Sequence, residues 1–264
     1  AIDGKTSRRS TNKADPNPLH LVSAFAAGVG VVLGQTATDE KSNEITAIPE
    51  LLATLALKGC IVTIDAMGTQ TDIARAIRAR EADYVLCVKD NHPKLGESIL
   101  LAQAGVGGKL KEVSRSETTT TGHGRTEVRR CWAFDAVERL YKAEQWQDLA
   151  SFAVVERERT VGTRSTTERR YYISSLPADA ERIAQAVRSH WEVENRLHWC
   201  LDVQFNDDQS RLRTGFAANN LAIVRHIVIN LVRLNTSRKA SIKTKRLLAA
   251  TSDQFRAELL GLHV

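Results

Sequence analysis

The chain has 264 residues, of which 42 % are hydrophobic, so it can form one large domain or one core that carries an inserted subdomain. Its longest apolar stretch, residues 216–234, is interrupted by two arginines and a histidine, so we expect no membrane span there. The sequence shows no positively charged start followed by an apolar run, so we expect no signal peptide. The 37 lysines and arginines outnumber the 31 aspartates and glutamates and give a net charge of +6, which favours an acidic partner only weakly.

The first hundred residues alternate between strand and helix patterns. Ala1–Asp3 is typical of the end of a strand, so we expect a natural precursor to extend further upstream. Strands are predicted over residues 19–25, 31–37, 60–64 and 84–88, and helices over residues 45–57, 71–81 and 93–104. This order predicts an α/β core with a mixed sheet, because the first three strands are joined by hairpins.

The remainder of the chain changes character after residue 104. Three strand-like runs, at 126–134, 151–159 and 168–174, predict a mostly β insertion. Helices are predicted over residues 177–201 and 216–234, and the tail from Thr236 is basic and then weakly helical. The expected division is therefore a first part of the core (1–104), a β-rich insertion (105–174), a helical remainder of the core (175–234) and a basic C-terminal tail (235–264).

Two aspartates follow strand patterns. Asp3 and Asp65 each stand where a predicted strand ends, with a glycine shortly after, and side chains at such positions project from the sheet edge where α/β folds place ligands. With a glutamate from a packed helix, Glu194, they would offer the oxygen ligands that Mg²⁺ prefers. Two ions about 4 Å apart could then serve an in-line displacement at phosphorus. The alternative from spacing alone is that both Asp-Gly neighbourhoods are ordinary turns.

The helix that carries Glu194 has an unusual pattern. At 3.6 residues per turn, one face carries His190, Glu194 and His198. An apolar stripe beside it comprises Val193, Leu197 and Leu201. Glu192 lies about 200° from Glu194 and so cannot share its site. A metal would give Glu194 the partner that a carboxylate near the core needs, whereas the alternative is a solvent-facing ion pair with Arg188 or Arg196.

Basic residues gather in three places. They are Lys5, Arg8, Arg9 and Lys13 at the start, Arg125, Arg129 and Arg130 in the middle, and Arg238, Lys239, Lys243, Lys245 and Arg246 in the tail. Such clusters suit a protein that holds phosphates beside metals. For any one cluster, solvated surface charge is an equal alternative. The four cysteines are scattered without a CxxC pair, which is typical of reduced thiols in a cytoplasmic protein.

Several blocks of residues resemble bacterial insertion-sequence transposases of the ISAs type, a group that includes the H-repeat-associated proteins. These blocks are Ala1–Lys5, Pro18–Phe25, Asp39–Ile45, Thr63–Gly68, His123–Arg125 and HWEVENRLHWCLDVQF at 190–205. They occur in the same order as in that family and cover nearly the whole chain.

The resemblance implies an RNase H-like catalytic core with a D-D-E triad. Matched by motif, the triad is Asp3, Asp65 and Glu194, which would hold Mg²⁺ or Mn²⁺, with two ions expected. The wider signature does not carry over. Related transposases place a tyrosine, an arginine and a lysine around the glutamate, and this sequence has Val187, His190 and Leu201 there.

The expected function is metal-dependent DNA cleavage and strand transfer, with DNA as the partner and a homodimer on DNA to hold two ends together. Candidate DNA contacts are Lys5, Arg8, Arg125, Arg129 and His198. Trp132, Trp191 and Trp199 could stack on a flipped base, although Trp191 and Trp199 are expected in the core. The alternatives are a non-catalytic DNA-binding remnant or regulator of an inactive element, and a nuclease that cuts without joining.

Overall fold

The computed structural model describes residues 1–11, 17–38, 44–105, 110–122 and 124–262. Lys13, Asp39–Asn43 and His123, which belong to the patterns above, lie outside the described residues. The chain divides into two compact units, each described here by itself. The first unit joins Ala1–Thr54 to Trp191–Val264, and the second unit is Leu55–His190. Among the described helices, none is long and apolar enough to cross a membrane.

The first unit is built on a three-stranded antiparallel sheet. Its strands lie in the order β3-β2-β1 and span Ile2–Thr6 (β1), His20–Ala26 (β2) and Val31–Thr38 (β3). The predicted hairpin strands are confirmed. The central strand β2 is buried along nearly its whole length, as expected for a strand paired on both edges. Asp3 is the second residue of β1 and pairs with Ser23, so it lies within the strand and not at its end as predicted.

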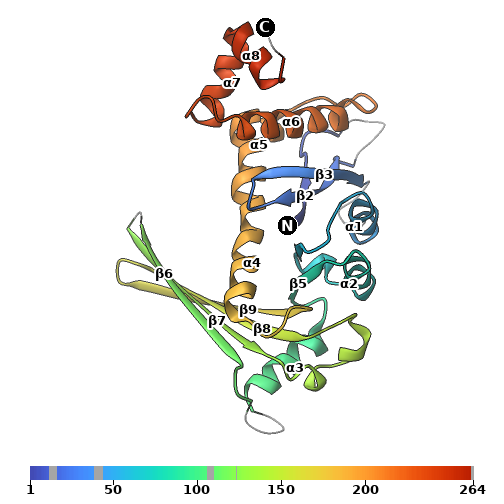
Figure 1. Ribbon diagram of the computed structural model, residues 1–264, viewed down its shortest axis with the longest axis vertical. Helices are drawn as coiled ribbons and strands as arrows, with labels where there is room; N and C mark the ends of the chain where they lie inside the picture. The colour runs from blue at the N-terminus through green and yellow to red at the C-terminus, as the bar shows by residue number, and fades with distance from the viewer. Residues whose placement is uncertain (12–16, 39–43, 106–109, 123, 263–264) are drawn as a thin grey trace. The chain divides into compact units, whose positions relative to one another are not determined.

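Helices cover this sheet (Figure 1). Helix α1 (Glu44–Ala53) contacts β2 and β3, and helix α6 (Ala217–Leu234) contacts β3. The Asn230 side chain on α6 accepts a hydrogen bond from the Val32 amide (2.8 Å) and donates one to the Val32 carbonyl (2.7 Å). Helix α1 ends four residues earlier than predicted because both the amide and the hydroxyl of Thr54 donate to the Leu51 carbonyl.

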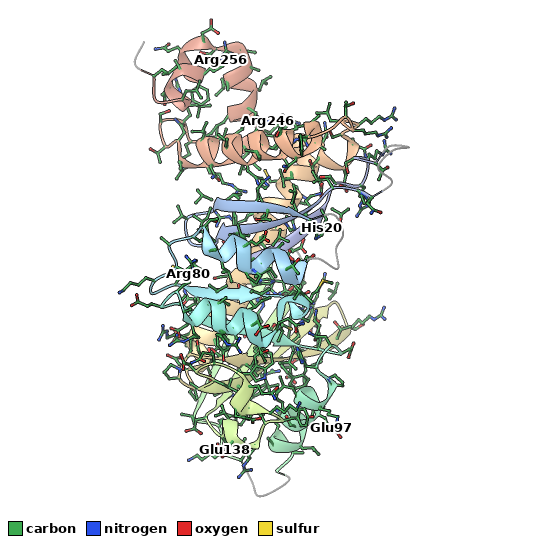
Figure 2. All side chains as sticks on the ribbon, turned by 90° about the vertical axis from the view of Figure 1, so that its right-hand side faces the viewer. His20, Arg80, Glu97, Glu138, Arg246 and Arg256 are labelled. Atoms are coloured by element: carbon green, nitrogen blue, oxygen red, sulfur yellow. The ribbon has the colours of Figure 1, made fainter. Side chains whose placement is uncertain are left out.

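The C-terminal helices of the first unit are α7 (Ile242–Thr251) and α8 (Asp253–Leu259). The Lys245 ammonium donates to the carbonyls of Val232 (3.0 Å) and Asn235 (2.5 Å), which closes the end of α6. Arg246, labelled in Figure 2, lies 4.1 Å from the centre of the Phe205 ring. Two residues of the basic tail therefore have structural partners.

The second unit contains a six-stranded mixed sheet in the order β4-β5-β9-β8-β7-β6. The strands span Ile61–Ile64 (β4), Asp83–Val88 (β5), Ser114–Gly122 (β6), Arg125–Phe134 (β7), Ser151–Val161 (β8) and Arg164–Ser174 (β9). Strands β4 and β5 are parallel, and every other neighbouring pair is antiparallel. Helices α2 (Thr71–Arg78) and α3 (Pro93–Gln103) confirm the predicted ones.

Four consecutive strands, β6 to β9, form two long hairpins that lie side by side (Figure 1). Helix α4 (Ala180–Glu192) packs Ile183, Ala186 and Val187 against them. Strand β6 was not predicted, because its threonine-rich sequence lacks apolar alternation. Threonine nevertheless favours extended backbone, and pairing with β7 along all nine residues makes this segment the exposed edge strand of the sheet.

Candidate active site

Asp3, Glu194 and His198 come together in the first unit. Asp3 is on β1, and the other two residues are on η5 (Val193–His198), the turn that continues α4 and contacts β1. His198 Nδ1 lies 3.6 Å from Asp3 Oδ2 and 3.5 Å from Glu194 Oε2. One ligand atom from each residue lies within 4.8 Å of the others, a spacing that one metal ion could bridge. Asp3 and His198 are mostly buried, and the Glu194 side chain is 53 % exposed.

The helix changes geometry at this point. Residues 193–198 form a π-helical turn, where the sequence predicts an uninterrupted α-helix, and the chain returns to α-helix in α5 (Trp199–Phe205). Such turns are rare and occur often at functional sites. Val193 and Leu197 are fully buried in the core of the first unit and hold the turn against the sheet, as the predicted apolar stripe requires. Glu194 and His198 remain on a common face.

Glu192, two residues before Glu194, is bound by an arginine and not by the Asp3–His198 group. Glu192 Oε2 accepts a hydrogen bond from Arg196 Nη1 at 2.6 Å, and the same nitrogen donates to the Ala27 carbonyl at 3.0 Å. Arg196 therefore binds Glu192, the residue that the helix geometry separates from Glu194.

The buried Asp3 carboxyl group has a strongly shifted pKa. Burial raises the pKa of Asp3 to about 6, the nearby His198 opposes this rise, and the Glu194 carboxylate adds to it. The Gly4 amide donates to Asp3 Oδ1 at 2.9 Å and also favours the charged form. A second carboxylate beside a buried one is unfavourable without a cation, so the two acids and the imidazole fit a divalent metal ion as a donor set.

Asp65 lies in the second unit, immediately after β4. Burial alone would raise its pKa, but the Ala66 amide and the Lys89 ammonium hold the pKa of Asp65 below its usual value. Lys89 follows β5, the strand parallel to β4, and its Nζ lies 3.0 Å from Asp65 Oδ1. The sequence reasoning did not single out Lys89, although parallel neighbouring strands bring their carboxyl ends to the same edge.

Hydrogen bonds fix the loop that carries Asp65. Asn91 donates to the Ala66 carbonyl, and the His92 ring bonds the Thr69 carbonyl at 2.6 Å. The Thr69 hydroxyl in turn donates to the Cys87 carbonyl at 2.7 Å. The main chain after Asp65 is therefore tied to the strand that precedes Lys89. His190, which the sequence places beside Glu194, shares a hydrogen bond with Thr63 (3.1 Å).

The predicted DNA contacts have different surroundings. Lys5 is largely buried beside a group of aspartates, whereas Arg8 is 79 % exposed and has Asp208 3.3 Å away. Arg125 is about half exposed near Glu127, and the less exposed Arg129 is bound by the same glutamate. In the first unit, Trp191 and Trp199 are 39 % and 55 % exposed, so their expected place in the core is wrong.

The reason for that error is the position of the two tryptophans on their helix. The buried stripe of residues 193, 197 and 201 faces the sheet, and Trp191 and Trp199 fall outside it. Trp132, on β7 in the second unit, lies under the Arg115 guanidinium at 5.7 Å from the ring centre.

Comparisons with known proteins identify the family. The Transposase DDE domain family matches residues 1–231. The chain is 39 % identical to the H repeat-associated protein YhhI and to protein YbfL of Escherichia coli (strain K12), over 99 % of this chain and 71 % of each relative. It is 41 % identical to YncI of Escherichia coli O157:H7, over 99 % of this chain and 68 % of the relative.

A solved structure shares the fold. The piggyBac transposase in a synaptic complex with hairpin DNA aligns with 98 % of this chain at a TM-score of 0.52 and 12 % identity. The aligned chain spans about half of that protein, 53 % of its length. The predicted class, an RNase H-like α/β fold with a mixed sheet, flanking helices and a mostly β segment before the helix of Glu194, is confirmed. The chain belongs to the DDE transposase family.

Proposed function

We propose that this chain is the catalytic part of a DNA transposase that cleaves and joins DNA strands with Asp3, Asp65 and Glu194 as its D-D-E triad. The observation that carries the proposal is the meeting of Asp3, Glu194 and His198, where a buried carboxyl group with a pKa near 6 has a second carboxylate beside it. Membership of the DDE family and the motif order around each acid support the assignment.

The proposed cofactor is Mg²⁺ or Mn²⁺, with two ions. The ligands proposed for these ions are the carboxylates of Asp3, Asp65 and Glu194, and His198 lies beside Asp3 and Glu194. When bound, the metal ions lower the pKa of the attacking hydroxyl or water and stabilise the leaving oxygen. Lys89 holds the Asp65 carboxylate charged before a cation binds, so the acid presents an anionic oxygen at neutral pH.

The proposed reaction has two chemically similar steps. In the first, a water oxygen bonds to phosphorus at the element's end while the bond from phosphorus to the 3′ oxygen breaks, which leaves a 3′-hydroxyl and a 5′-phosphate. In the second, the oxygen of that hydroxyl bonds to a phosphorus of the target while the bond from this phosphorus to its own 3′ oxygen breaks, which joins the element's end to the target and leaves a 3′-hydroxyl on the target strand. The protein's own task is to position the strands and neutralise charge, so no side chain acts as a covalent nucleophile.

The proposed partner is DNA, both element ends and target. Arg8, Arg125 and Arg129 are the proposed phosphate contacts, and Lys5 and His198 contribute less because both side chains are largely buried. The solved structure that shares the fold is a transposase in a complex with hairpin DNA, and membership of the DDE family supports the same class of partner for this chain. A homodimer would hold the two ends together during strand transfer.

The test is incubation of the protein with labelled element ends and Mg²⁺ or Mn²⁺. Joined products would support the transposase, and cut products without joining would show a nuclease. Intact DNA would favour the alternative of a non-catalytic DNA-binding remnant. Asp65→Ala is expected to abolish cleavage, whereas Asp72→Ala, which removes an exposed aspartate of α2, is expected to leave it unchanged. Full cleavage by Asp65→Ala would contradict the triad.

A further inference from the structure

Strand β1 presents two charged side chains on one face. Successive side chains of a strand alternate, so Asp3 and Lys5 share a face and Gly4 points to the other. On the far side, a side chain at Gly4 would clash with His20 and Glu44, which are buried and lie 2.6 Å apart. The glycine therefore allows β1 to lie directly on the His20–Glu44 pair. The opposite face of β1 carries Asp3 and Lys5.

The helix opposite β1 places side chains, at intervals of four residues, beside both of these charged groups. Glu194 and His198 lie beside Asp3, and Asp202, one further step along α5, lies beside Lys5. The strand and the helix therefore meet through two adjacent polar contacts. The first is the candidate metal-binding group, and the second is built around the Lys5 ammonium.

The Lys5 ammonium is surrounded by carboxylates. Its Nζ lies 2.8 Å from Asp202, 3.3 Å from Asp207 and 3.2 Å from Asp208, and the side chain is only 12 % exposed. Burial would lower the pKa of Lys5, but the three aspartates outweigh it and raise the pKa above its usual value. The ammonium occupies a group of three acids whose spacing would otherwise suit a metal ion.

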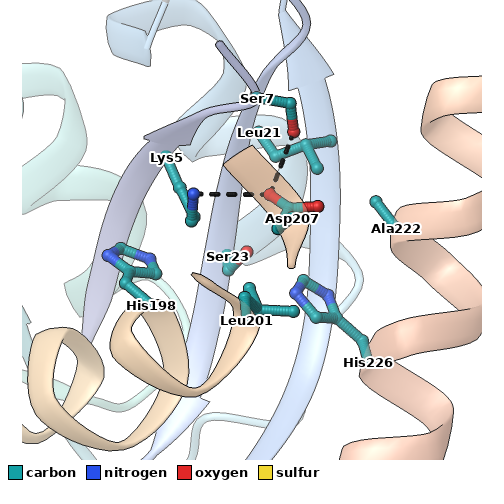
Figure 3. Close-up of a pocket in the computed structure, with 9 residues that line it drawn as sticks. All are labelled: Lys5, Ser7, Leu21, Ser23, His198, Leu201, Asp207, Ala222 and His226. Carbon is teal, nitrogen blue, oxygen red and sulfur yellow. Dashed lines mark hydrogen bonds and ion pairs between the residues drawn. The ribbon is translucent and has the colours of Figure 1, made fainter. Parts of the chain in front are cut away.

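The aspartates are themselves fixed in place. Asp207, which is 4 % exposed, accepts a hydrogen bond from the Ser7 hydroxyl at 3.2 Å and is paired with Arg225 of α6. Figure 3 shows Lys5 and Ser7, both from the first segment of the chain, pointing toward Asp207. Residues at the end of β1 are in this way tied to the segment that follows α5.

We propose that Lys5 is a positioning residue for the metal-binding carboxylates. Its ion pairs with Asp202, Asp207 and Asp208 fix β1 on the η5–α5 helix and so hold Asp3 beside Glu194 and His198. The inference rests on the proposed function, because Asp3 and Glu194 are there the metal ligands. It assigns to Lys5 a task other than the phosphate contact expected from the sequence.

The experiment measures Mn²⁺ binding by the full chain with electron paramagnetic resonance, which requires no DNA and no turnover. Lys5→Met, which keeps the length of the side chain without its charge, is expected to weaken Mn²⁺ affinity by about 10–100-fold, the usual effect of removing a group that orients a metal ligand. Lys5→Arg is expected to restore most of the affinity. Lys58→Met is the matched control, because Lys58 is 78 % exposed and pairs only with Glu81 among the ion pairs of the described residues.

Three comparisons decide the outcome. If Asp3→Asn binds Mn²⁺ as tightly as the wild type, the proposed metal site is wrong. If Asp3→Asn loses affinity while Lys5→Met keeps it, only the positioning role is overturned, even when Lys5→Met lowers the melting temperature. If Lys5→Met does not fold, the charge-balanced double variant Lys5→Met with Asp202→Asn takes its place, and undiminished affinity in that variant would equally overturn the proposal.

Discussion

At the scale of single residues, burial and neighbouring charges change the pKa of Asp3. Its pKa is raised from 3.8 to about 6, so without a cation the carboxyl group is protonated more readily in the folded protein than in the unfolded chain. A carboxyl group of this kind contributes stability that is fully present below pH 3.8 and is lost as the pH rises through about 6. A bound cation would reverse the loss, since it favours the charged carboxylate.

The pH dependence of stability should therefore differ between the wild type and Asp3→Asn. In the presence of a chelator, the free energy of unfolding of the wild type should fall relative to Asp3→Asn between about pH 4 and pH 7, by at most about 3 kcal/mol. Urea unfolding at several pH values measures the difference. Asp72→Asn, at an exposed position of α2, should follow the wild type. Parallel curves for the wild type and Asp3→Asn would show that Asp3 titrates normally.

At the scale of elements, β1 is fixed from both sides. Its Gly4 face lies on the His20–Glu44 pair, and its Asp3–Lys5 face meets the helix of Glu194. The His20 ring also bonds the Thr6 hydroxyl at 2.8 Å, so both β1 and α1 depend on this buried histidine. A change on either face of β1 is expected to move Asp3.

Gly4→Ala tests the contact between β1 and the His20–Glu44 pair. The added methyl group would meet Glu44 and His20, so the pair or the strand must shift, and we expect a loss of about 1–3 kcal/mol in the free energy of unfolding. Gly28→Ala is the matched control, because a methyl group there meets nothing within 4 Å, and its effect should stay within about 0.5 kcal/mol. Chemical denaturation measures both. Equal stability of the two variants would show that β1 has room to relax.

At the scale of the whole molecule, the two compact units contribute different parts of the proposed chemistry. The first unit supplies Asp3, Glu194 and the Lys5 contacts, and the second supplies Asp65, Lys89 and the arginine-rich strands. Many arginines of those strands are bound within the sheet. Arg130, for example, pairs with Glu117, Glu156 and Glu158. Net positive charge therefore overstates the number of arginines that can reach DNA.

Salt dependence of DNA binding separates the arginines that contact phosphate from the others. Arg125→Gln should weaken binding to any duplex sequence to a similar extent and reduce the slope of log K against log salt by about 0.9, the share of one phosphate contact. Titrations of labelled duplex at several salt concentrations measure the slope. Arg75→Gln, which removes an exposed arginine paired with Asp72, should leave it unchanged. An unaltered slope for Arg125→Gln would remove Arg125 from the interface.

The sequence by itself determined most of the elements and the family. Apolar periodicity located β2 to β5, α2, α3 and α6, because a strand or helix must bury one face whatever its partner is. It also separated Glu194 from Glu192, since the two point apart on any helix. Motif order identified the three acids and the DDE family. The assignment of those acids as a triad stays a prediction, because it depends on the motifs.

Only the tertiary structure decided which partners the charged residues have. Lys5 and Lys89 are ordinary basic residues in the sequence, and their roles depend on aspartates up to 203 positions away. The π-helical turn at 193–198 and the pairing of threonine-rich β6 were equally hidden, because both depend on neighbouring elements and not on local preference. The three acids could thus be named from the sequence, whereas the surroundings that raise the pKa of Asp3 and hold its strand in place required the fold.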